Sequence, residues 1–110
     1  MTQCEIAAFV QRRIDELGLD YSWPKAHNPI VTCGPDSAVG HAEPVHVQKG
    51  HLLHMDLGVR EANYSSDLQR MWYVLDEGET EAPPDVQRAF EVVANALETG
   101  GHHLKAGLPG

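Results

Sequence analysis

Two neighbouring segments in which apolar and polar residues alternate constrain the fold of this chain more than any other feature. In the first segment the apolar residues Leu53, Met55, Leu57 and Val59 alternate with His54, Asp56, Gly58 and Arg60. In the second segment one face carries Asp67, Gln69, Met71 and Tyr73, and the other carries Leu68, Arg70, Trp72 and Val74. A period of two is typical of half-buried strands. The two segments therefore predict the arms of one β-hairpin, which takes roughly residues 51–75.

The register of this hairpin decides how its two aspartates lie. A two-residue loop at residues 61–62 would pair Arg60 with Asn63 and would place Asp56 directly opposite Asp67. Side chains in that relation have Cβ atoms about 4.5–5.5 Å apart, where like charges repel. Such a pair needs a cation between the carboxylates or a retained proton on one of them, and we favour the cation. A β-bulge would instead turn one aspartate to the other face.

The remaining elements are two helices and one short strand. Residues 2–5 form a capping box ahead of a first helix, and Gly18 is a plausible residue to end it. The predicted buried stripe of this helix is Ile6, Phe9, Val10, Ile14 and Leu17. Residues 30–33 are β-like, and a second helix begins near Pro84 and is expected to end at Gly100-Gly101. The predicted buried face of the second helix is Val86, Ala89, Phe90, Val93, Ala94 and Leu97. This order predicts an α+β fold, an antiparallel sheet with helices packed on one side.

Composition excludes several classes of function. The chain has 110 residues, enough for one small domain, and its formal net charge of −8 argues against binding to nucleic acid or to an anionic membrane surface. No apolar run approaches the roughly 18 residues of a membrane span, and the first residues do not show the basic-then-apolar pattern of a signal peptide. Cys4 and Cys33 are isolated, which fits a reducing compartment, so we expect a cytoplasmic protein.

The aspartate-bearing segment resembles a known family. Asp56-Leu57-Gly58, followed by the run from Tyr64 to Arg70 (Tyr-Ser-Ser-Asp-Leu-Gln-Arg), is similar to the first metal-binding segment of the creatinase/aminopeptidase "pita-bread" metallopeptidases. That family includes methionine aminopeptidase, Xaa-Pro aminopeptidase and prolidase. Residues 28–37 and 40–44 resemble the strand and the histidine-bearing loop of the Xaa-Pro branch. The resemblance covers nearly the whole chain and implies half of a pita-bread fold, with residues 1–110 as the N-terminal half of a catalytic domain. By the same resemblance, a C-terminal half with a histidine and two glutamate ligands is expected to lie beyond residue 110.

The resemblance also implies the roles of individual residues. Asp56 would chelate one divalent ion, Asp67 would bridge two, and His41 would contact the substrate or its tetrahedral intermediate. The ions would be Mn²⁺, Co²⁺, Fe²⁺ or Zn²⁺, because carboxylates with a later imidazole suit all four. Taken alone, each aspartate is more often a solvated strand-end carboxylate, and His41 a solvated loop residue. His54 shares the predicted face of Asp56 and is interpreted as structural.

The function that the resemblance implies is metal-dependent hydrolysis of the N-terminal bond of short peptides, of the Xaa-Pro type. Two alternatives remain open: a non-catalytic relative that binds peptides or proteins, and a metal-free hydrolase of small guanidino compounds like creatinase. The paired aspartates count against both. The 110-residue piece by itself is expected to bind metal weakly and to be inactive. The expected partner is a short peptide substrate, and a homodimer is left open because relatives commonly dimerise.

Overall fold

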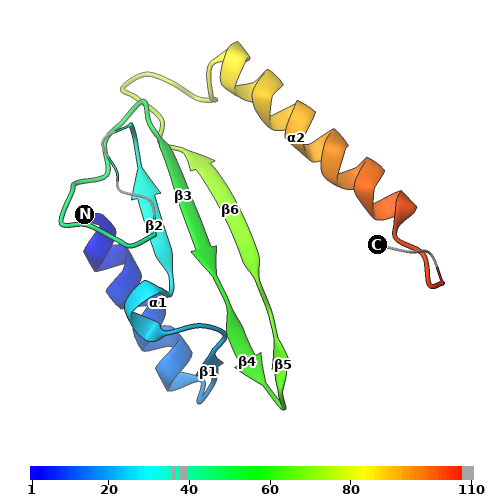
Figure 1. The fold of residues 1–110 in the computed structure, drawn as a ribbon. Helices are drawn as coiled ribbons and strands as arrows, with labels where there is room; N and C mark the ends of the chain where they lie inside the picture. Colours follow the sequence, from blue (N-terminus) through cyan, green and yellow to red (C-terminus); the bar gives the residue numbers. More distant parts are fainter. Residues whose placement is uncertain (36, 38–39, 108–110) are drawn as a thin grey trace. The chain divides into compact units, whose positions relative to one another are not determined.

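The chain is described here by a computed structural model that covers residues 1–35, 37 and 40–107 (Figure 1). Asp36, which falls within the stretch that resembles the Xaa-Pro branch, lies outside the described residues. The chain divides into two compact units, Met1–Gly78 and Glu79–Gly110. Each unit is described by itself.

The first unit is a mixed α+β structure built from one long helix and two small antiparallel sheets (Figure 1). In chain order its elements are α1 (Gln3–Glu16), β1 (Asp20–Tyr21), the 3₁₀ helix η1 (Lys25–His27), β2 (Ile30–Cys33), β3 (Leu52–Leu57), β4 (Val59–Glu61), β5 (Tyr64–Ser65) and β6 (Leu68–Tyr73). One sheet has the strand order β1-β4-β5, and the other has the order β2-β3-β6. The α+β fold class predicted from the sequence is confirmed.

The predicted hairpin is the centre of this unit. Its first arm is β3 followed by β4, and its second arm is β5 followed by β6, so that each arm takes part in both sheets. Within the two arms, strand geometry is interrupted at Gly58 on the first arm and at Ser66 and Asp67 on the second. The hairpin therefore spans both sheets, and the aspartate-bearing segment lies at the place where they join.

Helix α1 begins as the sequence predicts. The Thr2 hydroxyl accepts a hydrogen bond from the Glu5 backbone N–H at 3.2 Å, and the Glu5 carboxylate accepts one from the Thr2 backbone N–H at 2.7 Å. This second bond is the main reason that the pKa of Glu5 lies below its usual value. Gly18 follows the helix with φ +67, the left-handed conformation that glycine adopts without a steric penalty.

The buried face of α1 differs from the predicted stripe. Phe9 and Leu17 are 62% and 55% exposed, whereas Gln3, Ala7 and Ile14 are buried. Gln3 tolerates complete burial because its amide is bonded at both ends: Nε2 donates to Ser37 Oγ at 2.6 Å, and Oε1 accepts from the Glu43 backbone N–H. The polar residue Gln3 thus takes a buried position on α1 where hydrophobic periodicity alone would predict an apolar residue.

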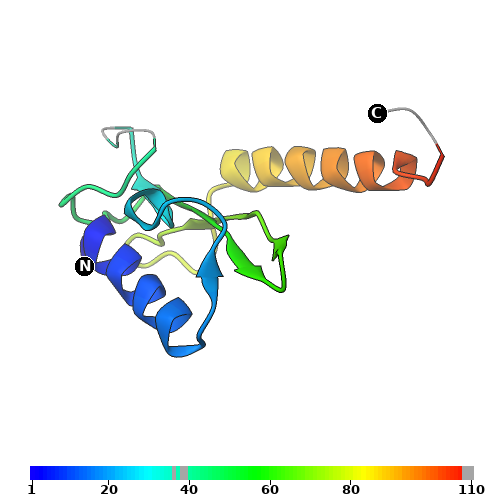
Figure 2. The ribbon, with the colours of Figure 1, turned by 60° about the horizontal axis from the view of Figure 1, so that its bottom comes forward.

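The core of the unit lies between α1 and β2, to one side of the strands (Figure 2). Val31 and Cys33 alternate with half-buried neighbours along β2 and are almost fully buried, at 0% and 4% exposure. Side chains alternate between the two faces of a sheet along each strand. Thr32 pairs with His54 on the face opposite to Val31, and Asp56 lies on that same face, two positions after His54. The aspartate is therefore on the face turned away from the helix.

A small polar cluster fastens the end of α1 to η1. The Asp15 carboxylate accepts hydrogen bonds from Lys25 Nζ at 2.6 Å and from the Tyr21 hydroxyl at 2.9 Å. These bonds, that of Lys25 first, hold the pKa of Asp15 below its ordinary value of 3.8. A carboxyl group with a lowered pKa stabilises the fold above its unfolded pKa and loses that contribution as pH falls through the folded pKa.

We therefore expect the Asp15→Asn variant to be less stable than the wild type at pH 7 and equally stable in strong acid. The difference should begin to shrink as pH drops below about the ordinary aspartate pKa. Urea unfolding of both proteins across that range measures it, with Glu81→Gln as the control, an exposed carboxylate in the acidic loop at residues 76–81. A difference that stayed constant with pH would show that the Asp15 charge contributes nothing.

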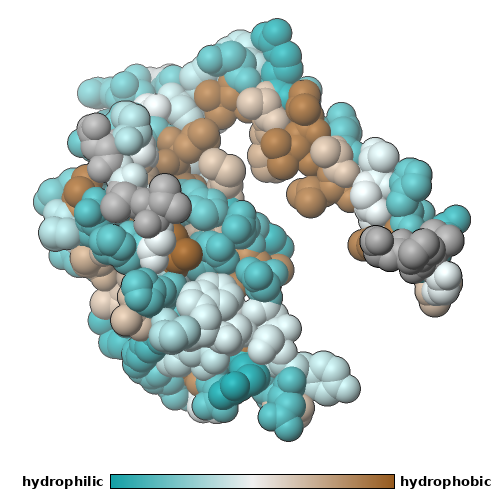
Figure 3. All heavy atoms as spheres, in the orientation of Figure 1, coloured by the Kyte–Doolittle hydropathy of each residue, from teal (hydrophilic) through white to brown (hydrophobic). Residues whose placement is uncertain are grey.

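The second unit contains one helix, α2 (Pro84–His103). It begins at Pro84 as predicted, but it continues through Gly100 and Gly101 to His103, because both glycines keep helical geometry and neither has a positive φ. Within this unit no residue of α2 is buried, and Phe90, Val93 and Leu97 are 65%, 59% and 73% exposed. The predicted buried face of α2 stays a prediction, because the helix stands alone in its unit. A single helix cannot cover its own apolar stripe, and hydrophobic residues gather along α2 in Figure 3. Among the described residues, no helix has the length and apolarity needed to cross a membrane.

Candidate metal centre

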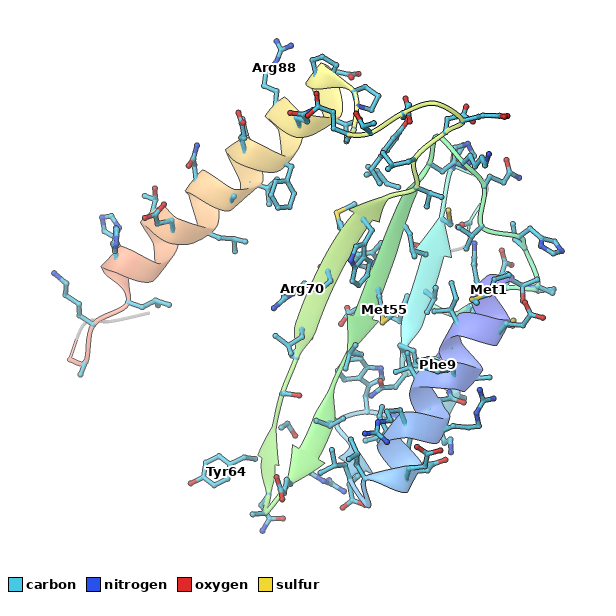
Figure 4. All side chains as sticks on the ribbon, turned by 180° about the vertical axis from the view of Figure 1, so that it is seen from behind. Met1, Phe9, Met55, Tyr64, Arg70 and Arg88 are labelled. Atoms are coloured by element: carbon cyan, nitrogen blue, oxygen red, sulfur yellow. The ribbon has the colours of Figure 1, made fainter. Side chains whose placement is uncertain are left out.

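The hairpin turns one residue later than its sequence predicts. Arg60 pairs with Ser65 and Glu61 with Tyr64, so the two-residue loop is Ala62-Asn63. Both loop residues have positive φ, +48 and +67, as the tight turn that suits the twist of a hairpin requires. Asparagine adopts this conformation more readily than most residues, which favours a loop that contains Asn63. Tyr64, directly after the loop, points outward at the hairpin tip (Figure 4).

This shift corrects the predicted pairing of the aspartates. Asp56 lies opposite Gln69, not Asp67. The two arms keep the same register on both sides of the junction, since Leu57 pairs with Leu68 and the Ser66 N–H donates to the Val59 carbonyl. No bulge intervenes, so Asp67 stands opposite Gly58 by count.

By this count Asp67 would be the diagonal neighbour of Asp56. The predicted sharing of a face is compatible with this register, because a shift of two positions preserves the alternation of side chains. It stays a prediction, since Gly58 and Asp67 lie between the paired strands. Diagonal partners are about 7–8 Å apart, which is wider than a direct pair but within reach of a shared ligand. The wider spacing also weakens the repulsion between the two carboxylates.

The two oxygens of Asp56 have different surroundings. Oδ2 accepts a hydrogen bond from Gln69 Nε2 at 2.8 Å, whereas Oδ1 is buried and has no hydrogen-bond partner among the described residues. A buried carboxylate oxygen without a partner is costly and calls for an explanation, such as a bound ion or water. Asp67 is exposed, and within the described part of the chain its carboxylate has no hydrogen bond or ion pair. Both aspartates thus keep oxygen lone pairs available.

The backbone between the aspartates is fixed by buried contacts around Gly58. The Asn28 side chain is fully buried and forms two hydrogen bonds with this glycine: Nδ2 donates to its carbonyl at 2.6 Å, and Oδ1 accepts from its N–H at 3.4 Å. The Ser22 hydroxyl bonds the carbonyls of Val59 and Ser66, both at 2.9 Å.

Gly58 has no space for a side chain. A Cβ atom there would collide with the Trp23 ring and the Ser66 carbonyl oxygen, and would come within 2.9 Å of Ser22 Cβ. These contacts hold the two arms together at the point where β3 passes into β4. The junction therefore sets the position of Asp56, two residues before it, and of Asp67 across from it.

His41 is not joined to the aspartates in the structure. Its side chain is half exposed, and its Nε2 lies 3.9 Å from Glu43 Oε1. The loop before it is tied to η1 through the Gly40 carbonyl, 3.2 Å from His27 Nδ1. Neither a hydrogen bond nor an ion pair links His41 to Asp56 or Asp67 within the described residues, so its catalytic role stays a prediction.

Two other polar residues of the hairpin lie where the sequence suggests. His54 pairs with Thr32 and Met71 on the face of Asp56, two positions before it. Arg70 pairs with Met55 and extends outward from β6 (Figure 4), and its Nη1 donates to the Gln69 carbonyl at 2.8 Å. Arg70 thus acts locally within the strand and not on the aspartates.

Two residues of this site were missed from the sequence. The role of Gln69 could have been predicted from a loop at Ala62-Asn63, because a hairpin with that loop pairs Gln69 with Asp56. Asn28 offered no sequence signal, because its partner is 30 residues away.

The donors present fit a divalent metal ion in part. Carboxylate oxygens are hard ligands for divalent ions, and Asp56 offers an oxygen that lacks any other partner. Within the described residues, no group of three or more histidine, cysteine, aspartate or glutamate side chains could hold an ion. The two aspartates therefore supply part of a ligand set.

Comparison with known proteins gives one match. The model of metallopeptidase family M24 matches residues 1–110, the whole of the chain. No curated protein and no solved structure matches the chain closely enough to be compared with it.

Proposed function

The chain belongs to metallopeptidase family M24, and on this premise we propose that it hydrolyses the N-terminal peptide bond of short peptides, preferentially of the Xaa-Pro type. Membership of the family implies a metal-dependent peptidase. The Xaa-Pro preference is supported by the resemblance of residues 28–37 and 40–44 to that branch. We further propose that residues 1–110 act together with a second half that completes the ligand set.

The observation that carries the proposal is the buried, unpartnered Oδ1 of Asp56. The register of β3 and β6, continued by count past Leu57 and Leu68, supports Asp67 as its diagonal neighbour. Asp56 and Asp67 would hold the metal through their carboxylate oxygens. A divalent ion bound there would polarise the scissile carbonyl and lower the pKa of an attacking water. His41, in the exposed loop before β3, would donate a hydrogen bond from its imidazole to the negative charge that develops on the substrate.

The scaffold contributes orientation. The Asn28 bonds to Gly58 and the Ser22 bonds across the arms hold the aspartate-bearing backbone in this arrangement. Ligands held in place before the metal binds lose little conformational freedom when it arrives, which favours binding. The residues that fix the hairpin junction therefore serve the metal site without touching it.

The test is a peptidase assay on the protein expressed from its complete coding region. We expect cleavage of Ala-Pro and Ala-Pro-Ala to stop after chelation and to return with Mn²⁺, Co²⁺ or Zn²⁺, while Ala-Ala is cleaved more slowly. Asp67→Asn should abolish the metal-restored activity, whereas Glu81→Gln, which removes one negative charge in an exposed loop, should retain it. Cleavage that survives chelation would contradict the proposal. Peptide binding without cleavage under any metal would favour the non-catalytic relative instead.

A further inference from the structure

The two oxygens of the Asp56 carboxylate are not equivalent, because a neighbouring side chain donates a hydrogen bond to one of them. Gln69 Nε2 donates to Oδ2 at 2.8 Å, while Oδ1 is buried and has no partner among the described residues. We propose that Gln69 is a positioning residue for the metal site, which fixes the Asp56 carboxylate so that Oδ1 is the oxygen offered to the ion. This inference rests on the proposed function.

The fold places Gln69 for this role. It is the direct cross-strand partner of Asp56, and its backbone is held in β6 by the pairs on either side, Leu57 with Leu68 and Met55 with Arg70. Its own carbonyl accepts a hydrogen bond from Arg70 Nη1 at 2.8 Å, which further orders this stretch of the edge strand. Directly opposite side chains are close enough for an amide to reach a carboxylate without strain.

The side-chain amide of glutamine is well suited to orient a carboxylate that binds a metal ion. An amide N–H gives a carboxylate a charge-assisted hydrogen bond yet adds no positive charge that would repel a cation. A lysine or an arginine at this position would compete with the ion for Asp56. A neutral donor orients the carboxylate and leaves its negative charge for the metal, as outer partners of metal ligands commonly do.

The geometry also predicts how Asp56 binds. The Gln69 bond uses one lone pair of Oδ2 and leaves the lone pairs of Oδ1 without a partner. We therefore expect the ion to bind at Oδ1, with the Gln69 amide still bonded to the carboxylate when the metal is present. Two separate measurements test the positioning and this mode of binding.

The first measurement compares Mn²⁺ affinity, by electron paramagnetic resonance of the free ion, in the wild type, Gln69→Met and Gln48→Met. Methionine keeps the length of glutamine but cannot donate, and Gln48 is an exposed glutamine that lies outside the strands of the hairpin. Gln69→Met should weaken binding about tenfold, as is typical when a partner of a metal ligand is lost. Gln48→Met should bind as the wild type does. Equal affinity in Gln69→Met would overturn the positioning role while leaving the metal site intact.

The second measurement follows the side-chain amide signals of Gln69 by NMR in metal-free and Zn²⁺-bound protein. In the metal-free protein we expect these signals to move when Asp56 is changed to asparagine, which shows the hydrogen bond directly. On addition of Zn²⁺ they should remain near their bonded positions. A return to the positions of a free amide would show that Gln69 leaves the carboxylate when the metal binds, and would overturn its positioning role. If the wild type binds neither Mn²⁺ nor Zn²⁺, the proposed function fails and this role fails with it.

Discussion

The Gly58→Ala variant is expected to lose about 3 kcal/mol of unfolding free energy, because a methyl group cannot fit at the hairpin junction. The added Cβ would collide with the Trp23 ring and with the backbone carbonyl of Ser66. The carbonyl cannot easily retreat, since the Ser66 N–H is bonded to Val59 and its oxygen accepts from Ser22. Urea unfolding followed by tryptophan fluorescence measures the loss.

Gly100→Ala is the matched control for this substitution. Nothing lies within 4 Å of a Cβ at Gly100, which sits in the regular helix α2. Alanine there should be neutral or slightly stabilising, because it favours the helix by about 1 kcal/mol over glycine. A Gly58→Ala protein as stable as the wild type would mean that the junction is loose, and the argument that it positions the aspartates would fall.

Replacing both Asp56 and Asp67 by asparagine is expected to lower Mn²⁺ affinity by far more than tenfold. Loss of an outer partner of a metal ligand costs about 10–100-fold in affinity, and a ligand itself contributes at least as much. Calorimetric titration at millimolar Mn²⁺ gives the comparison. The control is the double variant Glu77→Gln and Glu81→Gln, which removes the same number of charges from the acidic loop. Equal losses in both variants would show a general effect of charge and no site at the hairpin.

The sequence predicted the faces of the hairpin correctly and its register incorrectly, for separate physical reasons. Which residues share a face follows from alternation alone, so Asp56 and Gln69 were assigned to the correct side. The pairing depends on which residues form the loop. Ala62 in the left-handed region is uncommon, and a loop that uses it is hard to foresee without the tertiary contacts that fix the strands.

Local signals were most reliable where the interaction is local. The capping box at Thr2 and Glu5 and the ending at Gly18 were predicted because both depend on residues a few positions apart. The clamp of Asn28 on Gly58 joins residues 30 positions apart and leaves no pattern in the sequence. The buried Gln3 was missed for the same reason, since its partners come from a distant loop.

The central claim is that divalent ions bind at the aspartates of the hairpin, and paramagnetic broadening of amide NMR signals by Mn²⁺ tests it most directly. The method locates binding sites even when affinity is low. We predict that the signals of Asp56, Asp67 and Gln69 broaden at the lowest Mn²⁺ concentration, ahead of those of the acidic loop at residues 76–81. If the loop signals broaden first and the hairpin signals stay sharp, the aspartates do not form a metal site.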